Sequence, residues 1–262
     1  MANSLKLVKK LSSFIIRNAR IHILTVIDRI NAQLNPSAYN RVGIVNVCVP
    51  LYNRATMLQA LLQNLKEISE QNSDLQLRLV IADYASTDLG NIQLFVSKFQ
   101  LQFPCVLINL TGTFSKVTAI EKMVRHPEVG TDEIVFICDV DLKLPTNVFH
   151  KIRSAVRPGR QFYAPAIAFE KETGEIHFPW YDTRGTGFIS LFKSDYLKLN
   201  GFVGSIYEGK TTWGNEDEYL YASLQSRLGM KVYRVFEPSI ISRWHKRDAG
   251  SWYGDRKASR WD

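Results

Sequence analysis

The chain has 262 residues, of which 45% are hydrophobic and 22% charged, and its formal net charge is +8. This is an ordinary globular balance, and the length suits one large α/β domain or two small ones. No stretch of 18 uncharged apolar residues exists, and the N-terminus lacks the small-residue cleavage site of a secretory signal, so we expect neither a membrane-spanning helix nor a signal peptide.

The N-terminal segment carries most of the excess charge. Residues 1–40 hold six basic residues and one aspartate, which gives a net charge of +5. If residues 5–20 form a helix, their basic side chains fall on one stripe and their apolar side chains on the opposite face. Two interpretations stay open: a helix that lies on an anionic membrane surface, or a helix packed on the body of the protein. The polar stretch 31–40 predicts a linker.

Strand-like and helix-like segments alternate from residue 42 onward. Apolar runs predict strands at 42–49, 75–82, 105–110 and 133–138. Helices are predicted between them at 54–69, 91–102 and 115–125. After residue 160 an apolar run covers 185–192, a helix is predicted to start near Asn215, and strands are predicted at 230–238 and 239–244. This order indicates an α/β fold with a mostly parallel central sheet and helices on both faces. We therefore predict an appendage with a linker over residues 1–40 and a single domain over 41–262.

The end of the apolar run at 134–138 carries the first chemical signal. Asp139 and Asp141 follow it in the triplet "DVD", where two carboxylates on an extended chain point to one side. They repel each other unless a cation neutralises them, and carboxylate oxygens suit Mg²⁺ or Mn²⁺ that also binds phosphate oxygens. Ligands of parallel sheets bind beyond the carboxyl ends of the strands. The pattern predicts a metal–diphosphate site, and a solvated turn is the alternative.

Polar residues also follow the first two predicted strands. Arg54 of "VPLYNR" is a candidate phosphate ligand, because a guanidinium group matches phosphate oxygens. Asp83 of "VIADYASTD" ends an apolar run, where its carboxylate can accept hydrogen bonds from a base or a ribose. Asp88, in the same motif, is predicted to cap the next helix.

The motif "WGNEDEYLYASL" (213–224) predicts the start of a helix. Asn215 and Glu218 form a pair that resembles a capping box, and Glu216 and Asp217 lie in the first turn. Trp213 offers a platform for a sugar ring, and adjacent carboxylates beside an aromatic residue suit general-base work on a hydroxyl. The alternative is that the carboxylates only complement the helix dipole.

The motif "SRWHKRD" (242–248) follows an apolar strand. Its His245 is an acceptable Mn²⁺ ligand. Lys246 and Arg247 could neutralise a leaving diphosphate. A basic surface tail is the alternative interpretation.

The three cysteines, Cys48, Cys105 and Cys138, each lie in an apolar, strand-like run. No CxxC pair or Cys/His cluster is present, which argues against a zinc site. We predict reduced core thiols and a cytoplasmic location, at the inner face of the membrane if the basic helix binds lipid.

Taken in order, seven motifs resemble those of a known family: "VPLYNR", "VIADYASTD", "FSKVTAI", "FICDVDLKLP", "GTGFISLFKSDYLKLNGF", "WGNEDEYL" and "RWHKRD". They are similar to the catalytic domain of GT-A glycosyltransferases, within them the chondroitin N-acetylgalactosaminyltransferase and β-1,4-galactosyltransferase group. The resemblance spans residues 44–248. It implies a metal-dependent inverting transfer from a UDP-sugar, N-acetylgalactosamine or galactose, to a carbohydrate hydroxyl in polysaccharide or glycan synthesis.

The resemblance also implies residue roles. Asp141 and His245 would hold Mn²⁺, with Mg²⁺ as the alternative ion, and Asp217 would be the catalytic base beside Glu216. Ser242 stands where the galactosyltransferases have a methionine ligand, so no third side-chain ligand is predicted. The motifs and the resemblance together predict that the donor nucleotide or sugar is bound by Pro50, Asn53, Arg54, Asp83, Phe114, Lys116, Asp139, Trp213, Lys246 and Arg247.

Other functions stay open. A nucleotidyltransferase or phosphohydrolase would need a second carboxylate cluster for a second metal, and none is apparent near "DVD". The main alternative is a non-catalytic sugar-binding or scaffolding subunit of a polysaccharide synthase on the same fold. Asp141, Asp217 and His245 argue against it. Nucleic acid is not an expected partner, because the charge excess is N-terminal and no nucleic-acid motif appears. The oligomeric state is not predicted.

Overall fold

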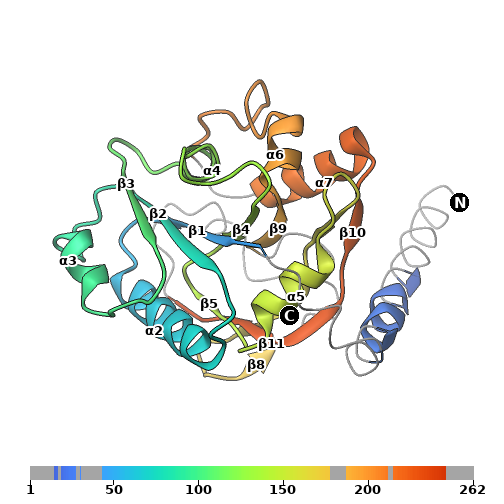
Figure 1. Cartoon of the computed structure of the whole chain (residues 1–262), viewed down its shortest axis with the longest axis horizontal. Coiled ribbons are helices and arrows are strands. Elements are labelled where there is room, and N and C mark those ends of the chain that lie inside the picture. Colours follow the sequence, from blue (N-terminus) through green and yellow to red (C-terminus); the bar gives the residue numbers. More distant parts are fainter. Residues whose placement is uncertain are drawn as a thin grey trace, which may run out of the picture.

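The computed structural model describes residues 15–16, 19–27, 30, 43–177, 187–211 and 215–245 (Figure 1). Within them, the main sheet has seven strands, in the order β10-β6-β9-β4-β1-β2-β3. Their bounds, in that order, are Lys231–Tyr233, Gln161–Tyr163, Phe188–Phe192, Ile134–Cys138, Val45–Leu51, Leu77–Asp83 and Cys105–Asn109. Strands β4, β1, β2 and β3 are parallel, whereas β9 is antiparallel to both β4 and β6. The sheet is therefore mostly parallel, as the sequence predicted.

A second sheet has the order β5-β11-β7-β8. These strands are Leu142–Lys143, Phe236–Ser242, Ala166–Glu170 and Ile176–His177. The sequence predicted one strand ending at Pro238 and another starting after it, which is wrong because β11 continues through Pro238. The register with β7 shifts between Glu237 and Ile241, so the strand accommodates a residue without a backbone N–H at an irregular point of the ladder.

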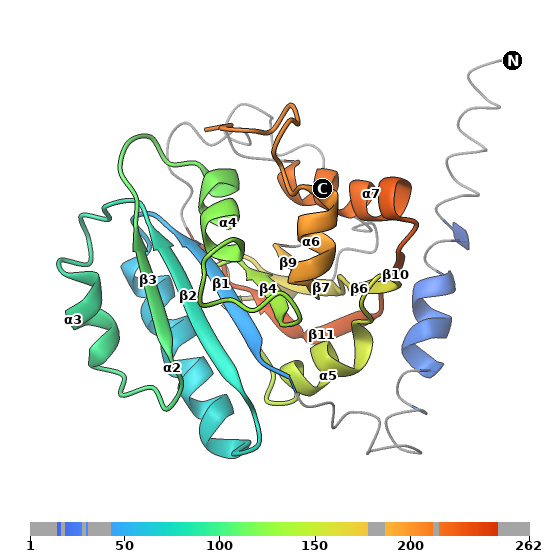
Figure 2. The same cartoon turned by 45° about the horizontal axis from the view of Figure 1, so that its top comes forward.

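Helices cover both faces of the main sheet (Figure 2). They are α2 (Ala55–Gln71), α3 (Ile92–Ser97), α4 (Lys116–Val124), α5 (Val148–Ala155), α6 (Lys193–Leu199) and α7 (Glu216–Leu228). Alternate residues of each strand point to opposite faces, so Val47 joins the core beneath α2 and α5, and Cys48 joins the core beneath α4 and α6. The predicted α/β fold with helices on both faces is confirmed.

The predicted cap of α3 by Asp88 is wrong. Asn91 caps α3 by accepting a hydrogen bond from the backbone N–H of Leu94 (3.0 Å). Asp88 instead accepts a hydrogen bond from the backbone N–H of Ala55 (2.9 Å), at the start of α2. Arg54, at the N-cap position of α2, makes no side-chain cap of its own. Asp88 therefore caps a helix that precedes it in the chain, not the one that follows.

The N-terminal helix packs on the body of the protein. Residues 19–27 are helical, Leu24 packs against the core, and Thr25 Oγ1 accepts a hydrogen bond from the backbone N–H of Phe236 in β11 (2.9 Å). Most of the predicted basic stripe over 5–20 and the whole predicted linker over 31–40 lie outside the described residues. Cys48 and Cys138 are free and buried in the core, whereas Cys105 is free and only partly buried. Among the residues that the structure describes, no helix combines the length and apolar character that crossing a membrane requires.

Candidate active site

The two aspartates of "DVD" lie at the carboxyl end of β4, beside the start of β9. The backbone N–H of Asp139 donates to the carbonyl oxygen of Gly187 (3.0 Å). Gly187 has a φ of +61°, and a Cβ atom there would lie 1.9 Å from Asp139 Oδ2. Only glycine therefore permits this approach of the β9 backbone to the carboxylate.

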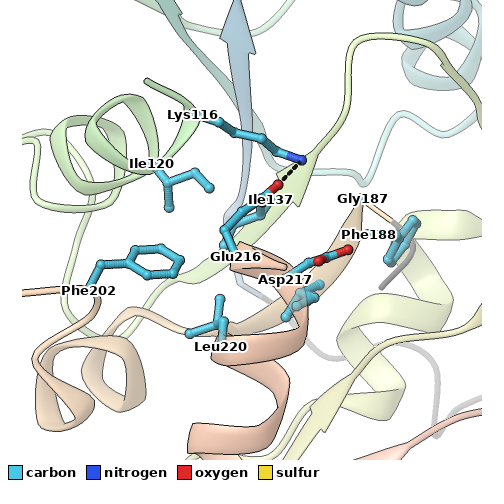
Figure 3. A pocket seen from close by; sticks show the side chains of 10 residues that line it. Lys116, Ile120, Ile137, Gly187, Phe188, Phe202, Glu216, Asp217 and Leu220 are labelled. Carbon is cyan, nitrogen blue, oxygen red and sulfur yellow. Dashed lines mark ion pairs between the residues drawn. The ribbon is translucent and has the colours of Figure 1, made fainter. Parts of the chain in front are cut away.

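Lys116 forms ion pairs with two carboxylates, one from the "DVD" triplet and one from the first turn of α7. Its Nζ lies 2.6 Å from Asp139 Oδ1. The same Nζ lies 3.0 Å from Glu216 Oε1 (Figure 3). Lys116 and Glu216 are about nine-tenths buried, with 10% and 8% of their side chains exposed. Burial opposes the lysine charge, but the carboxylates of Asp139, Glu216 and Asp217 outweigh it and hold the pKa of Lys116 well above its usual value. Lys116 thus stays protonated and neutralises carboxylates on two elements.

Asp217 lies in the first turn of α7, at a pocket with apolar walls (Figure 3). Burial is the main cause that raises the pKa of Asp217; Lys116 opposes it, and Glu216 adds to it. Its Oδ1 accepts a hydrogen bond from the backbone N–H of Glu218 (2.8 Å). A carboxylate with a raised pKa is a stronger base than an ordinary one, which suits it to accept a proton from a hydroxyl.

The predicted capping pair at this helix is wrong. Asn215 occupies the N-cap position, but its φ of +67° is left-handed and its side chain makes no capping hydrogen bond. An N-cap residue needs an extended backbone to turn its side chain back onto the first turn. The amide of Glu218 is bonded by Asp217 instead.

Asp141 and His245 are brought together by the pairing of β5 with β11, in which Ser242 lies opposite Leu142. His245 Nε2 lies 3.8 Å from Asp141 Oδ2. Two atoms that each lie about 2.1 Å from one ion are at most about 4.2 Å apart, so this separation fits a shared divalent ion. Imidazole nitrogen and carboxylate oxygen are also donors that Mn²⁺ accepts.

Ser242 is a contact that the sequence did not predict. Its hydroxyl donates to Asp141 Oδ2 (2.7 Å), and the backbone N–H of Arg243 donates to the Asp141 carbonyl oxygen (2.9 Å). Both bonds orient Asp141. Within the described part of the chain, no group of three or more His, Cys, Asp or Glu residues is placed to hold a metal ion.

The loops after β1 and β2 form one hydrogen-bonded unit. Asp83 Oδ1 accepts from the Ser86 hydroxyl (2.5 Å), and Ser86 Oγ accepts from the backbone N–H of Asn53 (2.9 Å). Asn53 Oδ1 in turn accepts from the backbone N–H of Thr87 (2.9 Å). Asp83 and Ser86 also line an open hollow of about 660 Å³ beside β3. Ser86 is a second contact that the sequence did not predict.

An aromatic cluster lies beside these loops. The rings of Tyr52 and Phe114 stack with centroids 5.6 Å apart, and Tyr84 meets Phe114 edge-on at 5.3 Å. Tyr52 is 41% exposed, so a face of the cluster is open to solvent. The tyrosine in the motif "VPLYNR" was the sequence signal from which a role for Tyr52 at the site could have been predicted. Pro50 is buried inside β1, opposite Ala82.

The predicted site residues therefore fall into three groups. The first surrounds Lys116, the second is the Asp141–His245 pair, and the third is the loop unit of Asn53, Arg54 and Asp83 with Phe114. Arg54 Nη1 donates to the Asn53 carbonyl oxygen (2.9 Å). Three predicted residues lie outside the described residues: Trp213, Lys246 and Arg247.

The fold and this arrangement of carboxylates define the class of GT-A glycosyltransferase folds. Similar solved structures include a mannosyltransferase from Pyrobaculum calidifontis in complex with GDP-Man and Mn²⁺, at 18% identity and a TM-score of 0.54 over 92% of this chain and 70% of that one. Another is TarS of S. aureus in complex with UDP-GlcNAc, at 14% identity and a TM-score of 0.56 over 79% and 60%. At these identities the likeness shows the fold.

The chain belongs to the chondroitin N-acetylgalactosaminyltransferase family, whose model matches residues 2–253. One relative is chondroitin sulfate N-acetylgalactosaminyltransferase 1 of Homo sapiens, which is 24% identical over 231 residues. Another is the N-acetyl-beta-glucosaminyl-glycoprotein 4-beta-N-acetylgalactosaminyltransferase 1 of Mus musculus, 24% identical over 221 residues. The matches cover 78% and 82% of this chain but only 41% and 20% of the two relatives.

Proposed function

We propose that the chain is a metal-dependent inverting glycosyltransferase. It moves N-acetylgalactosamine or galactose from a UDP-sugar to a carbohydrate hydroxyl in polysaccharide or glycan synthesis. The observation that carries this proposal is that the charges of three groups act on one another: Lys116 pairs with Asp139 and Glu216 and interacts with Asp217, and Asp139 interacts with Asp141, which lies beside His245. Membership of the family supports the same reaction class. Residues 41–262 are proposed as the catalytic domain and 1–40 as an appendage.

Asp141 and His245 are proposed as the protein ligands of Mn²⁺, with Mg²⁺ as the alternative. An ion bound there would supply positive charge to a leaving diphosphate. A β-1,4-galactosyltransferase 7 from Drosophila, solved with manganese, UDP-Gal and xylobiose, has a similar fold (13% identity, TM-score 0.50, 74% of this chain and 65% of that one), which supports a divalent metal. Lys246 and Arg247, beyond the described residues, are proposed to contact the same diphosphate.

Asp217 is proposed as the base that takes the proton of the acceptor hydroxyl. Its raised pKa strengthens it for that step, and one direct displacement at the anomeric carbon inverts the configuration. Glu216, held by Lys116, is proposed to bind sugar hydroxyls, with Asp139 beside it on the donor sugar or ribose. Trp213 is proposed to stack between donor and acceptor.

The nucleotide is proposed to lie on the loop unit after β1 and β2. Pro50, Asn53 and Arg54 border it, Asp83 accepts a hydrogen bond from the uracil, and the open face of the Tyr52–Phe114 cluster stacks on the ring. The free thiols support a reducing location, so we place the reaction in the cytoplasm.

The test is UDP release from a panel of UDP-sugars, in Mn²⁺ and in chelator, with and without oligosaccharide acceptors. We expect Mn²⁺-dependent release from one donor. Asp217→Asn should bind UDP as the parent does yet lose about 10²–10⁴-fold in turnover, because a positioned base contributes that much. Asp132→Ala, which removes an exposed acid elsewhere, is the matched control. UDP binding by the parent with no turnover of any donor–acceptor pair would instead favour a non-catalytic subunit.

A further inference from the structure

The N-terminal helix displays an apolar face that the rest of the described protein leaves exposed. Six branched aliphatic side chains in helical positions are 45–67% exposed: Ile15, Ile16, Ile23, Val26, Ile27 and Ile30. Within the helical residues 19–27, at about 100° of turn per residue, Ile23, Val26 and Ile27 fall within an arc of about 100°. We call this set the aliphatic arc.

The aliphatic arc is not the face by which the helix packs on the domain. Leu24 and Thr25, which contact the core and β11, project from the other side of the helix. A surface helix of a globular protein normally turns its apolar stripe to the core and its polar face to water. Here a helix fixed by one side presents isoleucines on the other, and an exposed patch of this kind marks an interaction site.

Charge decides between the possible occupants. Arg20, an exposed residue, borders the arc, and the whole segment 1–40 carries a net charge of +5. A second copy of this chain docked through the same helix would bring two such segments together, and like charges oppose that contact. An anionic lipid surface attracts them, and it also accepts branched aliphatic side chains at the boundary between headgroups and acyl chains.

We propose that the aliphatic arc docks on an anionic membrane surface and makes the protein a peripheral membrane protein. The helix lies in the interface, and its Leu24–Thr25 side holds the domain against it. This contact does not depend on the glycosyltransferase function. It also differs from the basic stripe predicted over residues 5–20, because it places aliphatic residues up to Ile30 at the lipid.

The test is sedimentation of the full chain with phosphatidylcholine vesicles, with and without phosphatidylglycerol. We expect binding to the anionic vesicles, weakened by salt. The double variant Ile23→Glu, Ile27→Glu should lower the partition coefficient at least about tenfold, because it removes two apolar contacts and adds two repelled charges. Leu94→Glu places the same charge at an exposed apolar site on α3 (65% exposed), away from the arc, and should bind as the parent does.

Two results would overturn the proposal. The first is parent-like vesicle binding by the Ile23→Glu, Ile27→Glu variant while its melting temperature shows it to be folded. The second is a lipid-free dimer, measured by sedimentation velocity, that this variant converts to a monomer; that result would make a second copy the occupant. A parent that stays monomeric without lipid and loses vesicle binding only through the arc variant supports the proposal.

Discussion

Lys116 is the residue on which the electrostatics of the site depend. Its amine lies between Asp139 and Glu216, two carboxylates supplied by elements far apart in the chain. The sequence predicted a donor-lining role for Lys116 from its motif. It did not predict the ion pair with Glu216, because nothing local relates positions 116 and 216.

Removing the charge of Lys116 should unbalance this cluster. We expect Lys116→Gln to lower the free energy of unfolding by about 3 kcal/mol, because breaking a buried ion pair leaves an uncompensated charge. Urea denaturation at neutral pH in chelator measures it. Lys116→Arg keeps the charge and should recover most of the loss. Equal stability of the Gln variant and the parent would show that the three side chains are not coupled.

The raised pKa of Asp217 predicts how stability depends on pH. The unfolded chain releases this proton near the ordinary value of 3.8, and the folded chain releases it only at higher pH. Between the two pKa values the folded state binds more protons, so the contribution of Asp217 to stability is lost as pH rises. Above both pKa values, deprotonated Asp217 therefore destabilises the fold.

Asp217→Asn should consequently raise the melting temperature at neutral pH in chelator. The gain should shrink as the pH falls toward 3.8, because Asp217 of the folded parent is then protonated and no longer carries a buried charge. Thermal scans of both proteins across that range measure the difference. A gain that is constant with pH would mean that the amide stabilises by another route.

At the scale of elements, most strands and helices could be predicted because apolar runs and polar strand ends are local signals. Caps and short strands could not. Asp88 and Asn215 both carry side chains suited to an N-cap, yet one caps a helix over 30 residues earlier and the other adopts a left-handed backbone. Which amide a side chain reaches is decided by the packing of the loops.

The Asp88 cap gives a prediction at this scale. Asp88→Ala should destabilise the protein by about 1 kcal/mol, because the first amide of α2 loses its acceptor. Hydrogen exchange of the first turn of α2 should accelerate, while that of α3 should not change. The reverse pattern, faster exchange in α3, would restore the assignment made from the sequence. Asn91→Ala is the matched variant for α3.

At the scale of the molecule, the site is assembled from loops that follow several strands of two sheets. Asp141 meets His245 only because β5 pairs with β11. The resemblance of ordered motifs predicted that these two residues act together, whereas composition and periodicity could not. The hydrogen bond from the Ser242 hydroxyl to Asp141 was not predicted, because the motif comparison showed only that Ser242 replaces a methionine.

Binding of UDP with Mn²⁺ should therefore stabilise the whole molecule only when the proposed metal ligands, Asp141 and His245, are both present. We expect UDP with Mn²⁺ to raise the melting temperature of the parent. The free energy of unfolding should rise by up to about 2.7 kcal/mol when UDP is present at 100 times its dissociation constant. Asp141→Ala should abolish this shift. An unchanged shift in Asp141→Ala would refute the metal assignment. Asp132→Ala should respond as the parent does.

The loop from Asp83 to Asp88 has a second structural role beside its place in the proposed nucleotide site. Its Ser86 and Thr87 bond to Asn53, and its Asp88 caps α2, so the same six residues shape the proposed nucleotide site and anchor a helix. Attempts to redesign nucleotide choice by exchanging this loop would disturb the folding of α2 at the same time. Engineering is better directed at Phe114 and Tyr52, whose rings can be replaced by larger or smaller side chains without removing the Asp88 cap of α2.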